Sequence, residues 1–462
     1  MPEHSHNARK SDKLSSKQRV KRPSKAQQRA GSIMANRESR LARKLDNHPA
    51  LLVFYAMLAG FGTYFCMYAF RKPFSAAEFD GQSFLGSEVG LKTALVISQI
   101  IGYTVSKYAG IKVLSEMSHA KRAVALIGLV GAAQVALLLY GVVSGPWKVV
   151  AIFLNGLPLG MVWGLVVSYL EGRRTSELLL AGLSCSFIVA SGVVKDIGRW
   201  VMADYGVSEG WMPVVVGGIF ILPFVGFVWM LNQLPEPNAE DVAERVERQP
   251  MNAEERWRFV RNFAPGLVAL LAVYFFLTAY RDFRDNYGVE LFRELGYGDK
   301  PAVFSQTELI VAFGVMVAMG LLNLIKDNTW GLIGAFVLMI GGLVLVGIAT
   351  ALLEAERIDG LTWMTLTGLG AYLCYVPYNS VLFDRLIAFT RVQGTAVFAI
   401  YLADALGYTG SIGIQLYKDI GQTEASRLGF FTGYSYTLTT FGVVALVLSC
   451  LYFVRKGRTA TG

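Results

Sequence analysis

The sequence predicts an all-α membrane protein of twelve transmembrane helices, arranged as two pseudo-symmetric six-helix halves. Three observations lead to this fold class: a very apolar composition, twelve long apolar runs, and a motif that occurs once in each half of the chain. The 462 residues are 53% apolar and 17% charged, with a mean hydropathy of +0.43. Soluble domains carry about 25% charged residues, so this composition indicates a membrane environment.

Each apolar run is close to the ~20 residues that cross a bilayer as a helix. We place the runs at residues 50–70, 89–114, 122–143, 148–170, 178–202, 212–232, 263–283, 302–325, 330–352, 361–386, 393–417 and 432–454. A soluble protein with a large apolar core is the alternative, but it would need shorter, amphipathic segments.

The twelve spans divide into two halves, at residues 49–232 and 263–456. A charged linker at residues 233–262 separates them, and a short tail follows at residues 457–462. Within the linker, residues 252–262 are predicted to form an amphipathic helix on the membrane surface.

A motif of the form Tyr-Phe-x-x-x-Ala-(Phe/Tyr)-Arg occurs at residues 64–71 and again at residues 274–281, an offset of 210 residues. Each copy ends an apolar run with an arginine, Arg71 or Arg281. An arginine at a span end can simply reach the headgroups, but the matched context favours a shared role. A planar guanidinium holds a phosphate or carboxylate through two parallel hydrogen bonds. The repeat therefore predicts a two-arginine clamp for a small anion between the halves.

The basic character of the chain is confined to its N-terminus. Residues 1–48 contain thirteen Lys or Arg and four acids, a net charge of +9, and the whole chain is also +9. This excludes a nucleic-acid-binding surface and predicts a disordered cytoplasmic arm that can contact anionic lipid. A transit peptide is the alternative. Connections on the same side as the arm carry most of the loop Lys and Arg, which predicts cytoplasmic N- and C-termini in a cell inner membrane.

Nothing in the sequence indicates an enzyme. The four cysteines fall in predicted spans without metal-ligand spacing, and the four histidines lie outside the spans. Ser-His-Asp, HExxH and Walker patterns are not evident. We expect a monomer in the lipid bilayer with no catalytic residue, cofactor or metal, whose partner is a small anionic substrate.

Charged residues inside the spans are the next candidates, because they normally face a cavity or a partner. Lys107 in the second span and Asp404 in the eleventh lie at similar depth. We predict a gating pair between them. In the alternative, Lys107 reaches the cytoplasmic surface and Asp404 binds a hydroxyl or backbone group.

The fifth span carries Lys195, Asp196 and Arg199 on one helical face, because they are spaced by one helical turn. The eighth span carries Glu308 near its outer end. We expect Lys195 or Arg199 to meet Glu308 in a second gate or coupling device. A local cluster of the three residues of the fifth span is the alternative.

Motifs in both halves resemble those of the major facilitator superfamily, specifically the organophosphate:phosphate antiporters typified by glycerol-3-phosphate and hexose-phosphate transporters. The resemblance covers nearly everything after residue 48. It is carried, in chain order, by Arg71-Lys72-Pro73-Phe74, Val105-Ser106-Lys107-Tyr108, Tyr280-Arg281-Asp282 with Asp285 beyond, Glu308, Gly394-Thr395-Ala396 and Gly407-Tyr408-Thr409-Gly410.

The resemblance implies that Arg71 and Arg281 bind the substrate phosphate, with Lys107 and Tyr68 as accessory substrate residues. Three departures stand out. The family's fifth-span histidine is missing near Phe187, its fourth-span tryptophan is missing although Trp163 lies one turn on, and Asp404 replaces a small or apolar residue.

We therefore expect a secondary active transporter that moves a small organic anion, a phosphorylated metabolite or inorganic phosphate, by alternating access. The first alternative is proton-coupled uptake of an organic anion or carboxylate through Asp404, because a buried carboxylate can carry a proton. The second is a sensor of a sugar phosphate that does not transport.

Overall fold

The computed structural model describes residues 40–461 apart from residues 116, 172, 174, 238–252, 301, 391–395 and 423. Residues 1–39 of the predicted arm and residues 238–252 of the predicted linker thus lie outside the described residues. Apart from a single bridge between Ser83 and Gly90, the described residues contain only helices, turns and loops.

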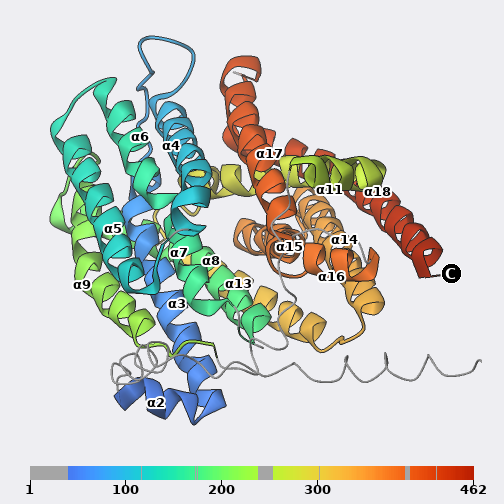
Figure 1. Ribbon diagram of the computed structural model, residues 1–462. Helices are drawn as coiled ribbons and strands as arrows, with labels where there is room; N and C mark the ends of the chain where they lie inside the picture. The colour runs from blue at the N-terminus through green and yellow to red at the C-terminus, as the bar shows by residue number, and fades with distance from the viewer. Residues whose placement is uncertain are drawn as a thin grey trace, which may run out of the picture.

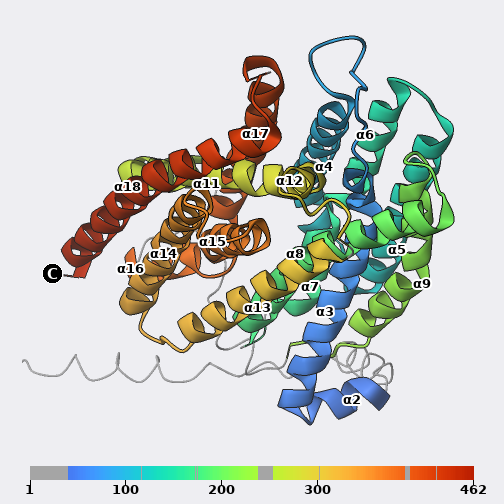
Figure 2. The ribbon, with the colours of Figure 1, turned by 180° about the vertical axis from the view of Figure 1, so that it is seen from behind.

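Two groups of helices stand side by side (Figures 1 and 2). The first group contains α3 (Pro49–Arg71), α4 (Leu91–Ser115), α5 (His119–Val142), α6 (Trp147–Leu159), α7 (Val162–Leu170), α8 (Ser176–Tyr205) and α9 (Met212–Asn232). The second contains α11 (Ala253–Asn286), α12 (Gly288–Glu294), α13 (Val303–Asn323), α14 (Asn328–Glu354), α15 (Gly360–Ser380), α16 (Leu382–Thr390), α17 (Ala396–Leu416) and α18 (Arg427–Thr461).

Nine helices within the described ranges are long and apolar enough to cross a membrane. The predicted spans at residues 89–114, 361–386 and 393–417 correspond to α4, α15 with α16, and α17, which lie outside that set. α4 and α17 carry polar side chains that are buried, including Gln99, Asp404 and Gln415.

The fourth and tenth spans are each broken, at corresponding places in the two groups. The span predicted at residues 148–170 is α6 followed by α7, and the one at residues 361–386 is α15 followed by α16. Pro158 lies in the last turn of α6 and Pro377 in the last turn of α15. A proline inside a helix removes a hydrogen bond and kinks or breaks it. The single helix predicted at residues 361–386 is therefore corrected, whereas Trp147–Leu170 is one candidate span with a break between α6 and α7.

The predicted surface helix at residues 252–262 is also wrong, because residues from Ala253 form the first turns of α11. Phe259 and Phe263 are buried there, and the ring of Phe263 packs on Phe453 of α18. Likewise, α18 continues to Thr461 instead of ending in a tail. Near the other terminus, residues at the end of the predicted arm form α2 (Arg40–Asp46).

The two groups meet along two pairs of helices, α8 with α13 and α4 with α17. α3 and α11 both run toward the end of the bundle that carries α12, which we call the α12 end. The opposite end, where α2 precedes α3, is the α2 end.

Close helix packing within each group depends on glycine. A Cβ on Gly156 of α6 would lie 2.5 Å from the backbone oxygen of Gln99 on α4. In the second group, a Cβ on Gly342 of α14 would lie 2.5 Å from the backbone oxygen of Gly370 on α15. Small residues at such contacts let helix backbones approach closely in membranes.

We expect Gly342→Ala to destabilise the protein by about 1–3 kcal/mol, because α14 and α15 must separate to admit the methyl group. Gly341→Ala is the matched control, since a Cβ there meets nothing within 4 Å and alanine favours the helix by about 1 kcal/mol. Thermal unfolding of the purified protein measures both. Equal shifts in Tm for the two variants would contradict the packing role of Gly342.

Candidate functional site

Arg71 ends α3 as a buried cation without a carboxylate. Its side chain is 7% exposed, and its guanidinium carbon lies 4.2 Å from the ring centroid of Tyr103 on α4. Nη1 makes a long 3.5 Å hydrogen bond to the Tyr68 hydroxyl, and Nε has no partner. Among the described residues, no carboxylate oxygen lies within 4 Å of this guanidinium. A buried charge in this condition attracts an anion.

Two amides hold the end of α3 that carries Arg71. Gln99 of α4 donates from Nε2 to the Arg71 carbonyl at 2.8 Å, and Asn155 of α6 donates from Nδ2 to the Phe70 carbonyl at 3.0 Å. A helix end leaves its last carbonyls unpaired, and these side chains satisfy two of them. The position of Arg71 is therefore fixed by α4 and α6.

Arg281 occupies the corresponding place on α11 but has a carboxylate beside it. Nη2 donates to Asp282 Oδ1 at 2.7 Å, and the guanidinium carbon lies 4.0 Å from the ring centroid of Tyr375 on α15. Nε has no partner, as in Arg71. Tyr68 lies close enough to Arg71 and Arg281 to interact electrostatically with both. The structure thus brings these three predicted residues together.

Aromatic rings surround the two arginines. Trp163 of α7 packs at 4.9 Å on Tyr64 and at 6.1 Å on Phe187 of α8, measured between ring centroids. Phe187 also lies 6.0 Å from the guanidinium carbon of Arg281. An aromatic ring of α8 therefore lies beside the second arginine, in the stretch where the resemblance led us to expect a histidine.

Lys107 and Asp404 make the predicted contact. Lys107 Nζ lies 2.5 Å from Asp404 Oδ2, and the pair joins α4 to α17. Tyr103 and Tyr408 flank the ammonium group, at 5.4 Å and 5.1 Å from Nζ to the ring centroids. The second carboxylate oxygen accepts a 2.8 Å hydrogen bond from the Tyr274 hydroxyl. A gating role for this pair stays a prediction.

Asp285 ties α11 to the first group at the α12 end. Its Oδ2 lies 2.6 Å from Nζ of Lys72, the residue after α3. Its Oδ1 lies 2.6 Å from Nζ of Lys195 on α8. The Ser191 hydroxyl also donates to Oδ1, and Lys72 donates in addition to Asn286 Oδ1 at 2.8 Å. One largely covered carboxylate, 14% exposed, therefore holds two helices of the opposite group.

Asp196 caps a helix of the opposite group. Its carboxylate accepts hydrogen bonds from the backbone N–H groups of Ser305 at 2.6 Å and Phe304 at 3.4 Å, at the start of α13. The N-cap residue of α13 is Ala302, whose methyl group cannot accept a hydrogen bond. A carboxylate at this position satisfies free N–H groups and favours the helix dipole. Arg199, one turn on, donates to the carbonyl of Gly298.

Glu308 is not paired with Lys195 or Arg199 as the sequence predicted. It accepts from Arg284 Nη1 at 2.6 Å, within the second group, and Arg284 also donates to the Met364 carbonyl at 2.8 Å. Arg284 lies one turn before Gly288 and faces α13, so it reaches Glu308 without crossing between the groups. The cluster of Lys195, Asp196 and Arg199 is not local either, because each contacts the opposite group.

The short helix α12 adds further contacts across the α12 end. Glu290 accepts from Lys92 of α4 at 2.7 Å, and both side chains are buried. Arg293 forms ion pairs with Glu78 and with Asp80, the latter at 2.8 Å, in the loop after α3. The hydrogen bond from Arg293 lowers the pKa of the Asp80 carboxyl.

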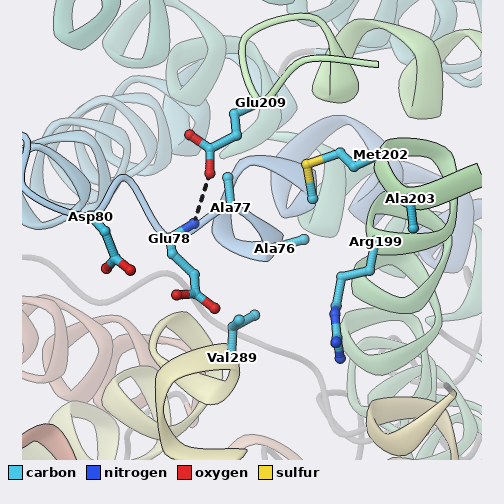
Figure 3. Close-up of a pocket in the computed structure, with 9 residues that line it drawn as sticks. All are labelled: Ala76, Ala77, Glu78, Asp80, Arg199, Met202, Ala203, Glu209 and Val289. Carbon is cyan, nitrogen blue, oxygen red and sulfur yellow. Dashed lines mark hydrogen bonds between the residues drawn. The ribbon is translucent and has the colours of Figure 1, made fainter. Parts of the chain in front are cut away.

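A pocket of about 430 Å³ lies beside α12 (Figure 3). The loop after α3, the last turns of α8, Glu209 and Val289 of α12 line it. The Glu78 backbone N–H donates to Glu209 Oε1 at 3.3 Å across its rim. Its carboxylates are thus already partnered, by Arg293 or by the backbone.

Sequence reasoning missed several residues of the site. Asp282 and Asp285 were noted only as part of a motif, and the aromatic residues Tyr103, Tyr274 and Tyr375 were not singled out. A usable signal existed for Tyr103, which precedes Lys107 by one helical turn and so lies on the same face. Tyr372, Tyr375 and Tyr378 follow the same spacing in α15.

The comparison with solved structures gives the class of protein. The crystal structure of a D-xylose–proton symporter matches with a TM-score of 0.58 at 15% sequence identity, covering 86% of this chain and 96% of that chain. At this identity the likeness concerns the fold. Together with the apolar helices, it makes this chain a multi-pass membrane protein with the major facilitator fold.

The chain belongs to DUF5690, a family of unknown function whose model matches residues 73–456. The comparison with curated proteins gives no match.

We expect Asp196→Ala to loosen the first turn of α13, because it removes the carboxylate cap supplied by the opposite group. Loss of an N-cap costs about 1 kcal/mol, so the amides of Phe304 and Ser305 should exchange about fivefold faster. Hydrogen exchange measured by mass spectrometry reports this. The control is Asp204→Ala, an exposed acid on the same helix; equal exchange in both variants would argue against the cap.

We expect Lys107→Met to destabilise the protein by about 3–5 kcal/mol, because it leaves Asp404 buried without its cation. Combining it with Asp404→Leu should recover most of the loss, since both charges are then gone. Thermal unfolding of the single and double variants measures the coupling, and Lys326→Met serves as an exposed-lysine control. Additive losses in the double variant would show that the pair does not interact in the folded protein.

Proposed function

We propose that this protein is a secondary active transporter that carries a small organic anion between its two six-helix halves by alternating access. Arg71 and Arg281 bind the anion, one from each half, and Tyr68 and Lys107 assist. The observation that carries this proposal is the buried Arg71 guanidinium, which has no carboxylate partner among the described residues. The fold supports the mechanism, because the neighbour that shares it is a symporter.

The balance of buried charge supports an anion with two negative charges. The two arginines of the repeat and the lysines of the proposed lock and gate are five cations, and three carboxylates paired with them neutralise part of their charge. The cations are Arg71, Lys72, Lys107, Lys195 and Arg281, and the carboxylates are Asp282, Asp285 and Asp404. Two positive charges remain in this set. A phosphate monoester carries roughly −1.5 to −2 at pH 7, so a phosphorylated metabolite or inorganic phosphate fits.

Alternating access requires contacts that break at one end while the other end closes. Lys72, Lys195 and Asp285 are candidates for the lock at the α12 end, with Asp196 and Arg199 beside them. Lys107 and Asp404 are candidates for a gate between α4 and α17. Glu308 supports Arg284 within one half, so we assign it a positioning role on α13.

Proton-coupled uptake of an organic anion is the second candidate function. Asp404 favours it, because this buried carboxylate is held by a lysine and by the Tyr274 hydroxyl, which in turn accepts from Asn379 Nδ2 at 3.2 Å. A carboxylate in such a network can take up a proton when Lys107 turns to a substrate anion.

The test is anion exchange in proteoliposomes that contain the purified full-length protein and internal phosphate. We expect wild type to exchange labelled external phosphate, and Arg71→Ala and Arg281→Ala each to lose at least 99% of the rate. Loss of one such charge-assisted pair costs about 3 kcal/mol or more, which corresponds to this factor. Arg258→Ala, on an exposed arginine of α11, should keep the wild-type rate.

Exchange that survives in both arginine variants would overturn the clamp. If folded wild type exchanges neither phosphate nor phosphate esters, a proton gradient with carboxylates is tested next. Carboxylate uptake that depends on the gradient and fails in Asp404→Asn would favour the second candidate. No transport under either condition, with retained binding of a sugar phosphate, would indicate a sensor.

A further inference from the structure

The two arginines of the repeat differ in the residue that follows them. Arg71 is followed by Lys72, and Arg281 is followed by Asp282 at the equivalent position, 210 residues later. Asp282 Oδ1 lies 2.7 Å from Arg281 Nη2, and both side chains are nearly buried. Arg71 has no such partner within the described part of the chain. In the first half the Arg71 guanidinium therefore lacks a carboxylate within the described residues. In the second half the charge of Arg281 is already neutralised by Asp282.

We propose that Asp282 is an internal counter-ion of Arg281, which a substrate anion must displace before it can bridge the two halves. This inference rests on the proposed anion transport. Burying a guanidinium without a negative charge costs free energy. Asp282 offsets this cost for Arg281 while the site is empty, whereas Arg71 is left to the anion. Displacement exchanges one anion for another on Arg281, so the arginine is never left without a partner.

When Asp282 leaves Arg281, the nearest described cation of the lock is one helical turn away. Asp282 precedes Asp285 by one turn of α11, and Asp285 binds Lys72 at 2.6 Å. Lys72 belongs to the opposite half and is one of the two lysines that hold Asp285. A carboxylate released from Arg281 therefore competes with Asp285 for Lys72. In this way an occupied anion site weakens the lock at the α12 end.

The asymmetry also sets the order in which the arginines act. The anion meets Arg71 first, because this guanidinium has no carboxylate to give up. It engages Arg281 second, at the cost of breaking the pair with Asp282. Return of Asp282 to Arg281 then helps the anion to leave. Asp282 is thus a positioning residue that limits affinity and promotes release.

The test compares Asp282→Asn with wild type, using inorganic phosphate as the probe. Equilibrium binding to the purified full-length protein should become at least tenfold tighter in Asp282→Asn, because the competing carboxylate is gone. Exchange in proteoliposomes should show a lower KM together with a lower kcat, because release is slower. Asp282→Glu restores the carboxylate and should return the Kd and both kinetic constants toward wild type. A purely structural role for Asp282 would instead weaken binding.

Glu254→Gln is the control. It removes the carboxylate from another arginine of α11, the exposed Arg258, and should leave the Kd for phosphate unchanged. A second comparison does not depend on Asp282→Asn alone. The double variant Arg281→Ala with Asp282→Asn removes both members of the ion pair and should weaken phosphate binding about tenfold. Arg71→Ala should weaken phosphate binding at least a hundredfold.

Three outcomes would overturn the inference. Phosphate binding that is unchanged or weaker in Asp282→Asn, with exchange intact in wild type, would remove the counter-ion role and leave the transport proposal standing. Equal losses of affinity in Arg71→Ala and in the double variant would remove the order of engagement. Wild type that binds and exchanges no anion at all would overturn the proposed function, and this inference with it.

Discussion

The contact on which the rest of the interface depends is the carboxylate of Asp285. It binds Lys72 at the end of α3 and Lys195 on α8, both at 2.6 Å, so a single side chain of the second half holds two helices of the first. Neither lysine is tolerable in this buried place without it, because an unpaired buried ammonium group is strongly destabilising. Asp285 lies one helical turn beyond Arg281, and Lys72 directly follows Arg71. The proposed anion site and the proposed lock therefore lie on the same helix ends.

The two ends of the bundle are held together by different forces. At the α12 end, ion pairs and a carboxylate-capped helix cross between the halves. At the α2 end, a cavity of about 40 Å³ between α8 and α13 is lined by apolar residues such as Met57, Met316 and Met319. Methionine side chains are flexible and adapt to a changing surface. The contact between α8 and α13 is therefore charged at the α12 end and apolar at the α2 end, while Lys107 and Asp404 also pair between α4 and α17.

The sequence predicted the helices and the depth of their charges, but not the direction in which each side chain points. Lys107 and Asp404 were paired correctly because each lies at a similar depth on facing helices. The predicted partner of Glu308 was wrong because two cations of α8 were at similar depth, and the nearer Arg284 lay in a stretch read as a loop. Asp285 was passed over for the same reason, since the predicted span ended at residue 283 and α11 continues to Asn286. The breaks after Pro158 and Pro377 left no gap in the apolar runs, so composition alone did not reveal them.

The aromatic surroundings explain how a site with so many charges is stable without a histidine. The Arg71 guanidinium lies on the ring of Tyr103, and the Arg281 guanidinium lies on the ring of Tyr375. The face of an aromatic ring attracts a desolvated cation. Phe187 also lies beside Arg281, and its ring does not titrate. In the proposed function, a proton that accompanies the anion would be taken up at a carboxylate. Asp404 is the carboxylate that contacts both Lys107 and a tyrosine hydroxyl, so proton coupling and anion binding would meet at Lys107.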